Sequence, residues 1–599
     1  MIGIPQTITG KDTVGGIAKI IAPAIILFIL GLLMYGSYSI GMSRVVYFVN
    51  GLSKPYKINI KGKEYALQPN HYHAIKVGEG RFEYTIREEE LKIKPQTITI
   101  KTPFLTRMFL KRLFIVNPDT AAVLLWEKIY YAEKPGDAPP TEYKFYNNSN
   151  FYVLPKIDYA FIPYPESVSL PDNKIIAKTR ISLPAAEGVH PLIQMKQIEA
   201  KMGKESAIEK AKTHLLRDPE NADSYLQYLL TAMEGKAYIE LASSGLSHRP
   251  ILVEWHRMYQ NAKEKYEPQY DLEPEYRSLL EADPENPALQ YLLGRVVTDQ
   301  IEAVGLFQKS VSGAKPLKRG YYAMAMHYLN SAQFEMSVAT MRKMMESFPC
   351  DLIDRALYFE ILAGAKKYDD LISEYQGELK KNPNDLSVIL SISFILITQG
   401  KVKEADNALG GWFVKHDDLI PSEARREVQT IYDIEKAYLT GDLETWSAMI
   451  DKNPTPERAF DLAITRGNME DAKAALEKME EKHSNIYLLL YIAMKKANRE
   501  DDARKYLGKA CEILRKEIWE ERRVADCLEG IKAPDPTQIC SLTFAPRQKI
   551  YILIALGMAY PEQRKIYFDM ARKLNTNKSF PHLFFESILA KISPQIIPQ

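Results

Sequence analysis

The chain has 599 residues, enough for several domains or for one long repeat array. Hydrophobic residues make up 46% of it and charged residues 26%, so a wholly disordered chain is excluded. The formal net charge is only +2, which argues against binding of polyanions by bulk charge, and we expect no nucleic-acid partner. The four cysteines form no C-x-x-C pair, so the sequence predicts neither a disulfide framework nor a cysteine zinc site.

The first feature along the chain is an apolar stretch, residues 20–40, without a charged side chain. At about 1.5 Å per helical residue, it is long enough for the ~30 Å hydrocarbon core of a bilayer. Lys19 and Arg44 flank it, and Tyr35 and Tyr38 lie near one end, where aromatic rings favour the membrane interface. The alternative is a cleaved signal peptide, but the run is longer than the usual apolar core of one and no clear A-x-A site follows. The sequence therefore predicts an uncleaved membrane anchor.

The predicted tail covers residues 1–19 and the predicted transmembrane helix covers residues 20–41. Basic residues lie on both sides of it: Lys11, Lys19, Arg44, Lys54, Lys57 and Lys61. Their bias by itself favours a cytoplasmic C-terminal side, but long domains are exported largely regardless of charge. Because a short basic tail is the usual start of a signal anchor, we expect a single-pass protein whose bulk is extracytoplasmic, on the periplasmic side.

Beyond the anchor, apolar and polar residues alternate as they do in half-buried strands. The clearest runs are YKINIK at 56–61, RFEYTI at 81–86 and QTITI at 96–100, with Gly, Pro and Asn between the runs. Short strands punctuated in this way predict an antiparallel, sandwich-like β-domain over 42–182.

Part of this region resembles a known kind of β-module. Residues 48–86 contain FVNG at 48–51 and VGEGRFEYTI at 77–86, and they resemble surface-layer and carboxypeptidase-regulatory-like β-domains. The resemblance covers that segment alone. It implies an accessory module, often outside the cytoplasm, with no chemistry of its own.

The β-rich region is basic, since residues 44–180 contain 21 Lys and Arg against 14 Asp and Glu. A basic module beside a bilayer favours anionic headgroups, which we count among the candidate partners. Within it, residues 104–114 mix apolar and basic side chains. We expect two packed strands there, with Arg107, Lys111 and Arg112 in solvent; the alternative is a segment that enters the membrane interface.

After a proline-rich stretch, with a linker predicted over 183–199, the chain becomes helical and repetitive. Prolines recur at intervals of 32, 33 and 34 residues, at Pro284, Pro316, Pro349 and Pro383. Turn sequences such as DPEN at 283–286 and NPND at 382–385 end one helix and cap the next. A period near 34 is typical of stacked helix pairs, so we predict an all-α superhelical solenoid over 200–599.

One unit of this region carries a recognisable pattern of large, small, aromatic and proline positions, formed by Tyr321, Met324, Ala325, Tyr328, Ser337, Met341 and Pro349. On these residues the region resembles the tetratricopeptide repeat (TPR) family, over about 200–592 and most clearly over 284–420. The unit 352–385 departs from the pattern, since Phe359 replaces a small residue, and the repeat count after residue 441 stays open. The resemblance implies a superhelix whose elongated groove binds peptides or other proteins.

In that family the groove-facing residues usually come from the first helix of each pair. The resemblance therefore makes Tyr322, Asn330, Arg355 and Ser391 the candidate protein-binding residues. The alternative for each is an ordinary surface position in solvent.

The sequence lacks G-x-x-x-x-G-K-[ST], G-x-G-x-x-G, H-E-x-x-H and G-x-S-x-G motifs. His71 and His73 alternate as two ligands on one strand would, but the local spacing places no third ligand. We therefore expect no catalytic residue, no cofactor and no metal, although a site without a motif would escape this search.

The expected function is a membrane-anchored scaffold or assembly factor that binds partner proteins or peptides through its solenoid. The alternative is a non-catalytic regulatory or recognition subunit of a membrane enzyme or transport complex.

Overall fold

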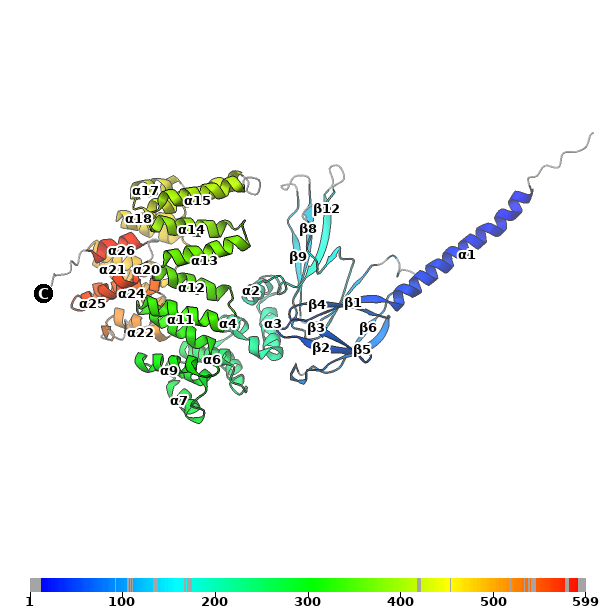
Figure 1. The fold of residues 1–599 in the computed structure, drawn as a ribbon, viewed down its shortest axis with the longest axis horizontal. Helices are drawn as coiled ribbons and strands as arrows, with labels where there is room; N and C mark the ends of the chain where they lie inside the picture. The colour runs from blue at the N-terminus through cyan, green and yellow to red at the C-terminus, as the bar shows by residue number, and fades with distance from the viewer. Residues whose placement is uncertain are drawn as a thin grey trace, which may run out of the picture. The chain divides into compact units, whose positions relative to one another are not determined.

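The computed structural model describes residues 12–91, 93–104, 107, 109, 111–132, 138–147, 149–165, 168–169, 175–416, 422–452, 454–516, 519–532, 534–536, 539, 544, 546–576 and 581–590, without the side chains of 12–24, 352, 519 and 520. An apolar helix is followed by a β-rich region and then by a long series of helices (Figure 1), which confirms the predicted order of the fold. The chain forms two compact units, Met1–Ala262 and Lys263–Gln599.

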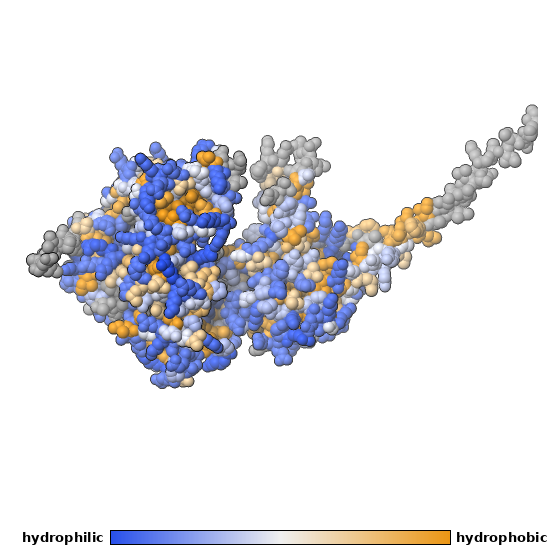
Figure 2. Space-filling view, in the orientation of Figure 1, coloured by the Kyte–Doolittle hydropathy of each residue, from blue (hydrophilic) through white to orange (hydrophobic). Residues whose placement is uncertain are grey.

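The first helix, α1 (Asp12–Met42), contains the predicted anchor. Its span Ile25–Met42 is long and apolar enough to cross a membrane. Most of the described side chains along that span are exposed, and Figure 2 shows them as a hydrophobic stretch in orange. This agrees with the helix expected over 20–41.

The β-rich region consists of three four-stranded sheets. The central sheet has the order β10 (Phe151–Leu154), β7 (Leu113–Val116), β1 (Arg44–Val49) and β4 (Tyr72–Val77). The first outer sheet has the order β3 (Lys63–Leu67), β2 (Tyr56–Ile60), β5 (Gly80–Ile86) and β6 (Gln96–Ile100). The second outer sheet has the order β11 (Tyr159–Ala160), β12 (Ile176–Ser182), β8 (Leu124–Tyr131) and β9 (Glu142–Tyr146).

The central sheet is buried on both faces. In β1, Val46 and Phe48 belong to the core shared with the first outer sheet, whereas Tyr47 and Val49 pack in the core shared with the second. Because successive side chains of a strand point to opposite faces, β1 reads as a continuous apolar run, while β2 and β5 alternate. The predicted sandwich therefore has a third layer. Most strand pairs are antiparallel, but β1–β7 and β11–β12 are parallel.

Within residues 104–114, the expected exposure of Lys111 and Arg112 is confirmed, that of Arg107 is wrong, and residues 105, 106, 108 and 110 lie outside the described residues. Among the described residues of this segment, only those from Leu113 onward form a strand, β7. Arg107 is not in solvent, because its guanidinium forms an ion pair with Glu79, and the two side chains are only 13% and 10% exposed. The segment lacks the regular alternation of apolar and polar residues that a half-buried strand needs. Its Arg107 instead contacts the end of α1.

The first compact unit also contains helices. They are α2 (Pro191–Met202), α3 (Lys204–Arg217), α4 (Asp223–Ala232), α5 (Gly235–Ser244) and the start of α6 (Val253–Tyr266). The segment predicted as a linker, 183–199, is thus helical from Pro191. Lys210 of α3 is 1% exposed, and its Nζ donates to the backbone oxygens of Thr120 at 2.9 Å and Ala122 at 3.1 Å. This contact fixes α3 to the β-domain.

A buried carboxylate organises the other side of that contact. Asp119 accepts hydrogen bonds from the backbone nitrogens of Gly51 at 2.9 Å and Ala121 at 2.7 Å, and from the Tyr56 hydroxyl at 2.8 Å. Burial raises the pKa of Asp119, although these hydrogen bonds and the charge of Lys210 act to lower it. Burial lowers the pKa of Lys210 to about 7, with Asp119 opposing the shift. The network joins three segments that are distant in the chain.

The second unit is all-α in the residues described. Its helices are α7 (Glu273–Ala282), α8 (Pro287–Gly294), α9 (Gln300–Ser312), α10 (Lys318–Asn330), α11 (Phe334–Ser347), α12 (Leu352–Gly364), α13 (Tyr368–Lys381), α14 (Leu386–Thr398), α15 (Val402–Lys415), α16 (Ser422–Leu439), α17 (Leu443–Lys452), α18 (Pro456–Arg466), α19 (Met469–Lys478), α20 (Ser484–Lys496), α21 (Glu500–Leu514), α22 (Trp519–Leu528), α24 (Pro546–Ala559), α25 (Arg564–Leu574) and α26 (His582–Leu589). Figure 1 shows α11 to α15 side by side in chain order.

Three consecutive helix pairs in this unit repeat with a period of 34 residues. The first helices α10, α12 and α14 begin at 318, 352 and 386 and have 13 residues each, and the second helices α11, α13 and α15 begin at 334, 368 and 402 and have 14. The turns between them place Ala332, Lys366 and Gly400 at positive φ, again 34 residues apart. In each turn the next backbone N–H reaches back five residues, which closes the helix end in a Schellman motif.

The period is lost further along the chain. The corresponding left-handed residues are Gly441, Gly467 and Asn498, which lie 26 and 31 residues apart. The last helices then pack back onto earlier ones: the Arg522 guanidinium donates to the backbone oxygens of Glu264 at 3.1 Å and Lys265 at 2.7 Å. The second unit is therefore closed by its own C-terminal helices.

Candidate functional site

Three of the four residues expected to face a groove take part in contacts within the array. The Tyr322 hydroxyl donates to Asp354 of the next first helix, and Lys318 binds the same carboxylate at 2.7 Å. Arg355 pairs with Glu378 at 3.3 Å. The Ser391 hydroxyl donates to the backbone oxygen of Ser387, at 2.9 Å.

The Asp354 contact holds two repeats together. Its side chain is fully buried, and Lys318, Tyr322 and the Asp351 backbone N–H all donate to it. Burial opposes ionisation, but the hydrogen bonds from Lys318 and Tyr322 outweigh it, so the pKa of Asp354 is lowered. Tyr322 therefore packs between repeats, where it stabilises the stacking of α10 and α12.

The fourth residue, Asn330, is covered by the C-terminal helices. It is 1% exposed, and its backbone oxygen accepts a hydrogen bond from the Nζ of Lys549 on α24, at 2.7 Å. Lys549 is also 1% exposed and lies 219 residues away in the sequence. The surface on which Asn330 was expected to contact a partner is thus occupied by the chain itself.

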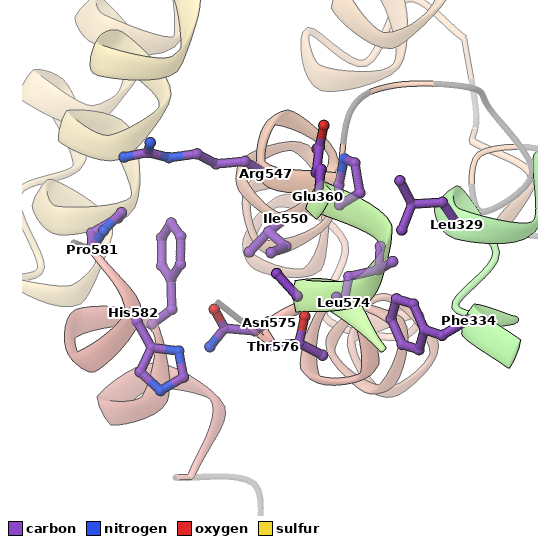
Figure 3. Close-up of a pocket in the computed structure, with 14 residues that line it drawn as sticks. Leu329, Phe334, Glu360, Arg547, Ile550, Leu574, Asn575, Thr576, Pro581 and His582 are labelled. Atoms are coloured by element: carbon purple, nitrogen blue, oxygen red, sulfur yellow. The ribbon is translucent and has the colours of Figure 1, made fainter. Parts of the chain in front are cut away.

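A cavity of about 170 Å³ lies between these C-terminal helices and the first repeats (Figure 3). In Figure 3, Leu329 and Phe334 line one side of it, and Pro581 and His582 line the other. Ile550, Leu574 and Phe585 add apolar surface, whereas Glu360, Arg547 and Asn575 add polar groups. A volume of this size suits a small molecule of about the size of benzene, and it is too small for a peptide.

Charged groups from three helices meet near Arg547. Burial raises the pKa of Asp461 in α18 to about 8, with Arg547 opposing the shift and Glu435 and Glu457 adding to it. Burial also raises the pKa of Glu435 in α16. On α26, the backbone N–H of Leu583 donates to the Tyr438 hydroxyl at 3.1 Å, which ties the C-terminal helices to α16. This region forms the closure of the array.

A larger hollow lies on the regular repeats. It is an open groove of about 500 Å³ between α13, α14 and α15, lined by Gln376, Leu379, Lys380, Pro383, Ile389, Ala408, Gly411, Trp412, Lys415 and His416. Trp412 forms its floor, where the indole N–H donates to the Pro383 backbone oxygen at 3.1 Å and the His416 ring stacks on the indole at 4.3 Å. Exposed Lys380 and Lys415 stand at its rim. We call these residues the α13–α15 groove.

Among the described residues, no three His, Cys, Asp or Glu side chains are grouped to hold a metal ion. His71 and His73 lie on the β-domain, where the His71 ring contacts Tyr72 and the His73 ring contacts Tyr65. The α13–α15 groove combines a tryptophan, apolar side chains and exposed lysines.

No protein-family model and no curated protein matches this chain. The sequence reasoning missed the role of α24. One signal was present, because Lys549 is followed by twelve uncharged residues, an unusual composition for a helix exposed on one side. The α13–α15 groove lies inside the segment 284–420, where the repeat pattern is clearest, but its lining residues come mainly from second helices and from the start of α14.

Proposed function

We propose that the protein is a membrane-anchored scaffold or assembly factor, with α1 in the bilayer and the helical array as the surface for partner proteins. The observation that carries the proposal is the run of three equal helix pairs with an open, aromatic-floored groove on α13–α15. Such arrays work by presenting a long rigid surface, and an anchor raises the local concentration of that surface beside the membrane.

The kind of repeat proposed is TPR-like. The 34-residue period, the left-handed turn at 332, 366 and 400, and the residue pattern of 318–351 support this assignment. The proposed topology is single-pass, with the tail in the cytoplasm and the bulk on the periplasmic side.

The partner test places a photo-crosslinking amino acid at Gln376 in the α13–α15 groove of the full chain, in its native membrane. The control position is Ile566 on α25, which is 52% exposed and lies outside the groove. A defined protein captured at 376 and not at 566 supports the proposal, and Lys380→Glu with Lys415→Glu should weaken its capture. Equal capture at both positions, or none at 376, contradicts it.

The topology test uses a cell-impermeant thiol reagent. Single cysteines replace Lys11 in the tail and Lys236 in α5, in a chain that carries Cys350→Ser and Cys540→Ser to lower the background. Labelling at 236 alone supports the proposed orientation, whereas labelling at 11 alone reverses it.

The second candidate is a regulatory or recognition subunit of a membrane enzyme or transport complex. The closed C-terminal half favours it, because a closed array leaves the α13–α15 groove as a restricted site for one fixed partner. Purification in mild detergent separates the two candidates. A stoichiometric membrane partner that survives salt washing indicates the subunit, and several transient partners indicate the scaffold.

A further inference from the structure

Phe104 and Arg107, which follow β6, are bound to the last turns of α1. The Ser37 hydroxyl of α1 donates to the backbone oxygen of Phe104 at 2.6 Å, and the Arg107 guanidinium donates to the Ser37 backbone oxygen at 3.0 Å. A Cβ at Gly41 would stand 2.3 Å from the Arg107 guanidinium, so a larger residue there would displace the Arg107 side chain. The loop and the helix thus form one junction.

Glu79 of the β-domain stabilises this junction through ion pairs. Its carboxylate binds Arg44 at 2.7 Å and Arg107 at 2.5 Å, and its backbone N–H donates to Gly41 at 2.7 Å. The three side chains are 10–13% exposed. Burial opposes the charge of Glu79, but the hydrogen bonds from Thr102 and Arg44 outweigh it, so the pKa of Glu79 is lowered. An ion-paired cluster of this kind holds Arg107 firmly against α1.

The position of the junction along the axis of α1 corresponds to a membrane surface. The predicted transmembrane helix, residues 20–41, rises about 32 Å at 1.5 Å per residue, close to the ~30 Å thickness of a hydrocarbon core. Ser37, whose hydroxyl binds the Phe104 backbone oxygen, lies about 6 Å before the end of that length, and Gly41 lies at the end. If α1 crosses the bilayer, the loop therefore lies at the level of the headgroups.

The side chains around the junction suit that level. Large apolar groups are exposed there: Phe109 is 73%, Met42 60%, Tyr38 59%, Val45 41% and Phe104 39% exposed. Exposed basic residues surround them at the strand ends nearest α1: Lys76, Arg81, Lys101, Lys111 and Arg112. Glu83 in β5 is an exposed acid, whereas Glu79 is paired with its two arginines.

We propose that this junction is a second membrane contact: Phe104 and Phe109 insert into the headgroup region beside α1, and Lys111 and Arg112 bind anionic lipid headgroups. We call these four residues the interfacial loop. The inference rests on the proposed insertion of α1. An aromatic group at the interface and basic groups against anionic lipid are both favourable, and the rigid junction means that little conformational entropy is lost on contact. The contact holds the β-domain flat on the bilayer and gives it a fixed orientation.

The test uses the full chain in lipid nanodiscs of phosphatidylcholine, with or without phosphatidylglycerol. A fluorescent amino acid replaces Phe109, and a nitroxide lipid labelled near the headgroup is the quencher. Two matched positions serve as controls. Leu30 in α1 reports insertion of the helix, and His73 is an exposed site on β4, four residues and about 13 Å further along the sheet than Val77.

Quenching at 109 and 30 but not at 73 is expected. Quenching at 30 without quenching at 109 overturns the interfacial loop and leaves the membrane anchor in place. Absence of quenching at 30 removes the proposed insertion of α1, and the inference falls with it.

The charge part is tested separately with Lys111→Glu and Arg112→Glu in the chain labelled at 109. Each change should lower the inserted population roughly five-fold in discs that contain phosphatidylglycerol, with little change in pure phosphatidylcholine. Equal quenching in both lipids overturns the headgroup contact. Both residues are exposed, so the variants should keep the wild-type unfolding midpoint, which is measured alongside.

Discussion

Each compact unit contains a lysine that is 1% exposed and that donates to a backbone carbonyl far away in the sequence, yet the two lysines have different surroundings. Lys210 reaches residues of the β-domain within a network that includes the buried carboxylate Asp119. Lys549 reaches Asn330, and two partly buried acids of the C-terminal region, Asp461 and Glu435, lie near Arg547. Burial raises the pKa of an acid in both units, but Asp119 in the first unit also accepts several hydrogen bonds, whereas the shift of Asp461 in the second is opposed by the charge of Arg547.

The difference indicates two ways to hold distant segments together. In the first unit, hydrogen bonds to Asp119 join two segments of the β-domain and Lys210 joins α3 to the same turn, so loss of the carboxylate leaves several buried donors unpaired. In the second unit, apolar packing of α24 to α26 supplies most of the contact, and the acids make it sensitive to pH.

Asp119→Ala should destabilise the first unit most, by about 4 kcal/mol or more. It leaves the Gly51 and Ala121 N–H groups and the Tyr56 hydroxyl buried without an acceptor, at about 1–3 kcal/mol each. Hydrogen exchange in increasing urea, read by mass spectrometry, reports each unit separately. The second unit should be unchanged, and Asp119→Asn should be milder because it keeps one acceptor oxygen. Equal loss in both units would contradict the separation.

Asp461→Asn should stabilise the second unit at pH 8 more than at pH 5. The folded pKa of Asp461, about 8, lies above the ordinary value of 3.8, so the folded state keeps a proton that the unfolded state loses. The contribution of this proton to the free energy of unfolding is complete below about pH 4. It is lost as the pH rises to 8, by at most about 1.4 kcal/mol per pH unit. Urea unfolding from pH 4 to 8 measures the slope of the free energy of unfolding against pH. We expect Asp461→Asn to remove this slope. An identical slope in the variant would show that Asp461 is ionised in the folded protein.

Lys549→Met should destabilise the second unit by about 2 kcal/mol, because the Asn330 carbonyl loses its buried donor while the packing volume is nearly kept. Protection of α24 and α10 in hydrogen exchange should fall together. The matched control is Lys565→Met on α25, where the lysine is exposed. A loss as large in the control as in the test variant would rule out the specific role of Lys549.

The smallest effect concerns the regular repeats. Lys366 is exposed and has a φ of 56°, whereas the equivalent residue of the next repeat, Gly400, has no Cβ to strain at its φ of 80°. Lys366→Gly should therefore raise the stability of the second unit by about 1 kcal/mol, and Gly400→Ala should lower it by a similar amount. Thermal unfolding measures both. The same sign for both variants would mean that the turn conformation does not control stability here.

Local patterns account for much of the fold. The uncharged run at 20–40, the alternation of β2, β5 and β6, and the period of 34 residues are properties of neighbouring residues, so they could be recognised before the fold was known. The prediction for Arg107, within residues 104–114, was wrong because its partner lies in α1. Asn330 was expected on the surface but is buried, because the Lys549 side chain that binds its backbone oxygen is 219 residues away in the sequence.

By itself, the sequence determined the type and order of the elements: an apolar helix, short strands and then helix pairs. Their hydrophobic period reflects which faces must leave water, and this is local information. Only the tertiary structure decided the third β-layer, the Asp119 and Lys210 network, the closure of the array on Asn330 and the junction of Glu79 with Arg44 and Arg107. Each of these depends on pairing groups from distant segments, because a buried charge or carbonyl is stable only where a partner from elsewhere in the chain arrives to satisfy it.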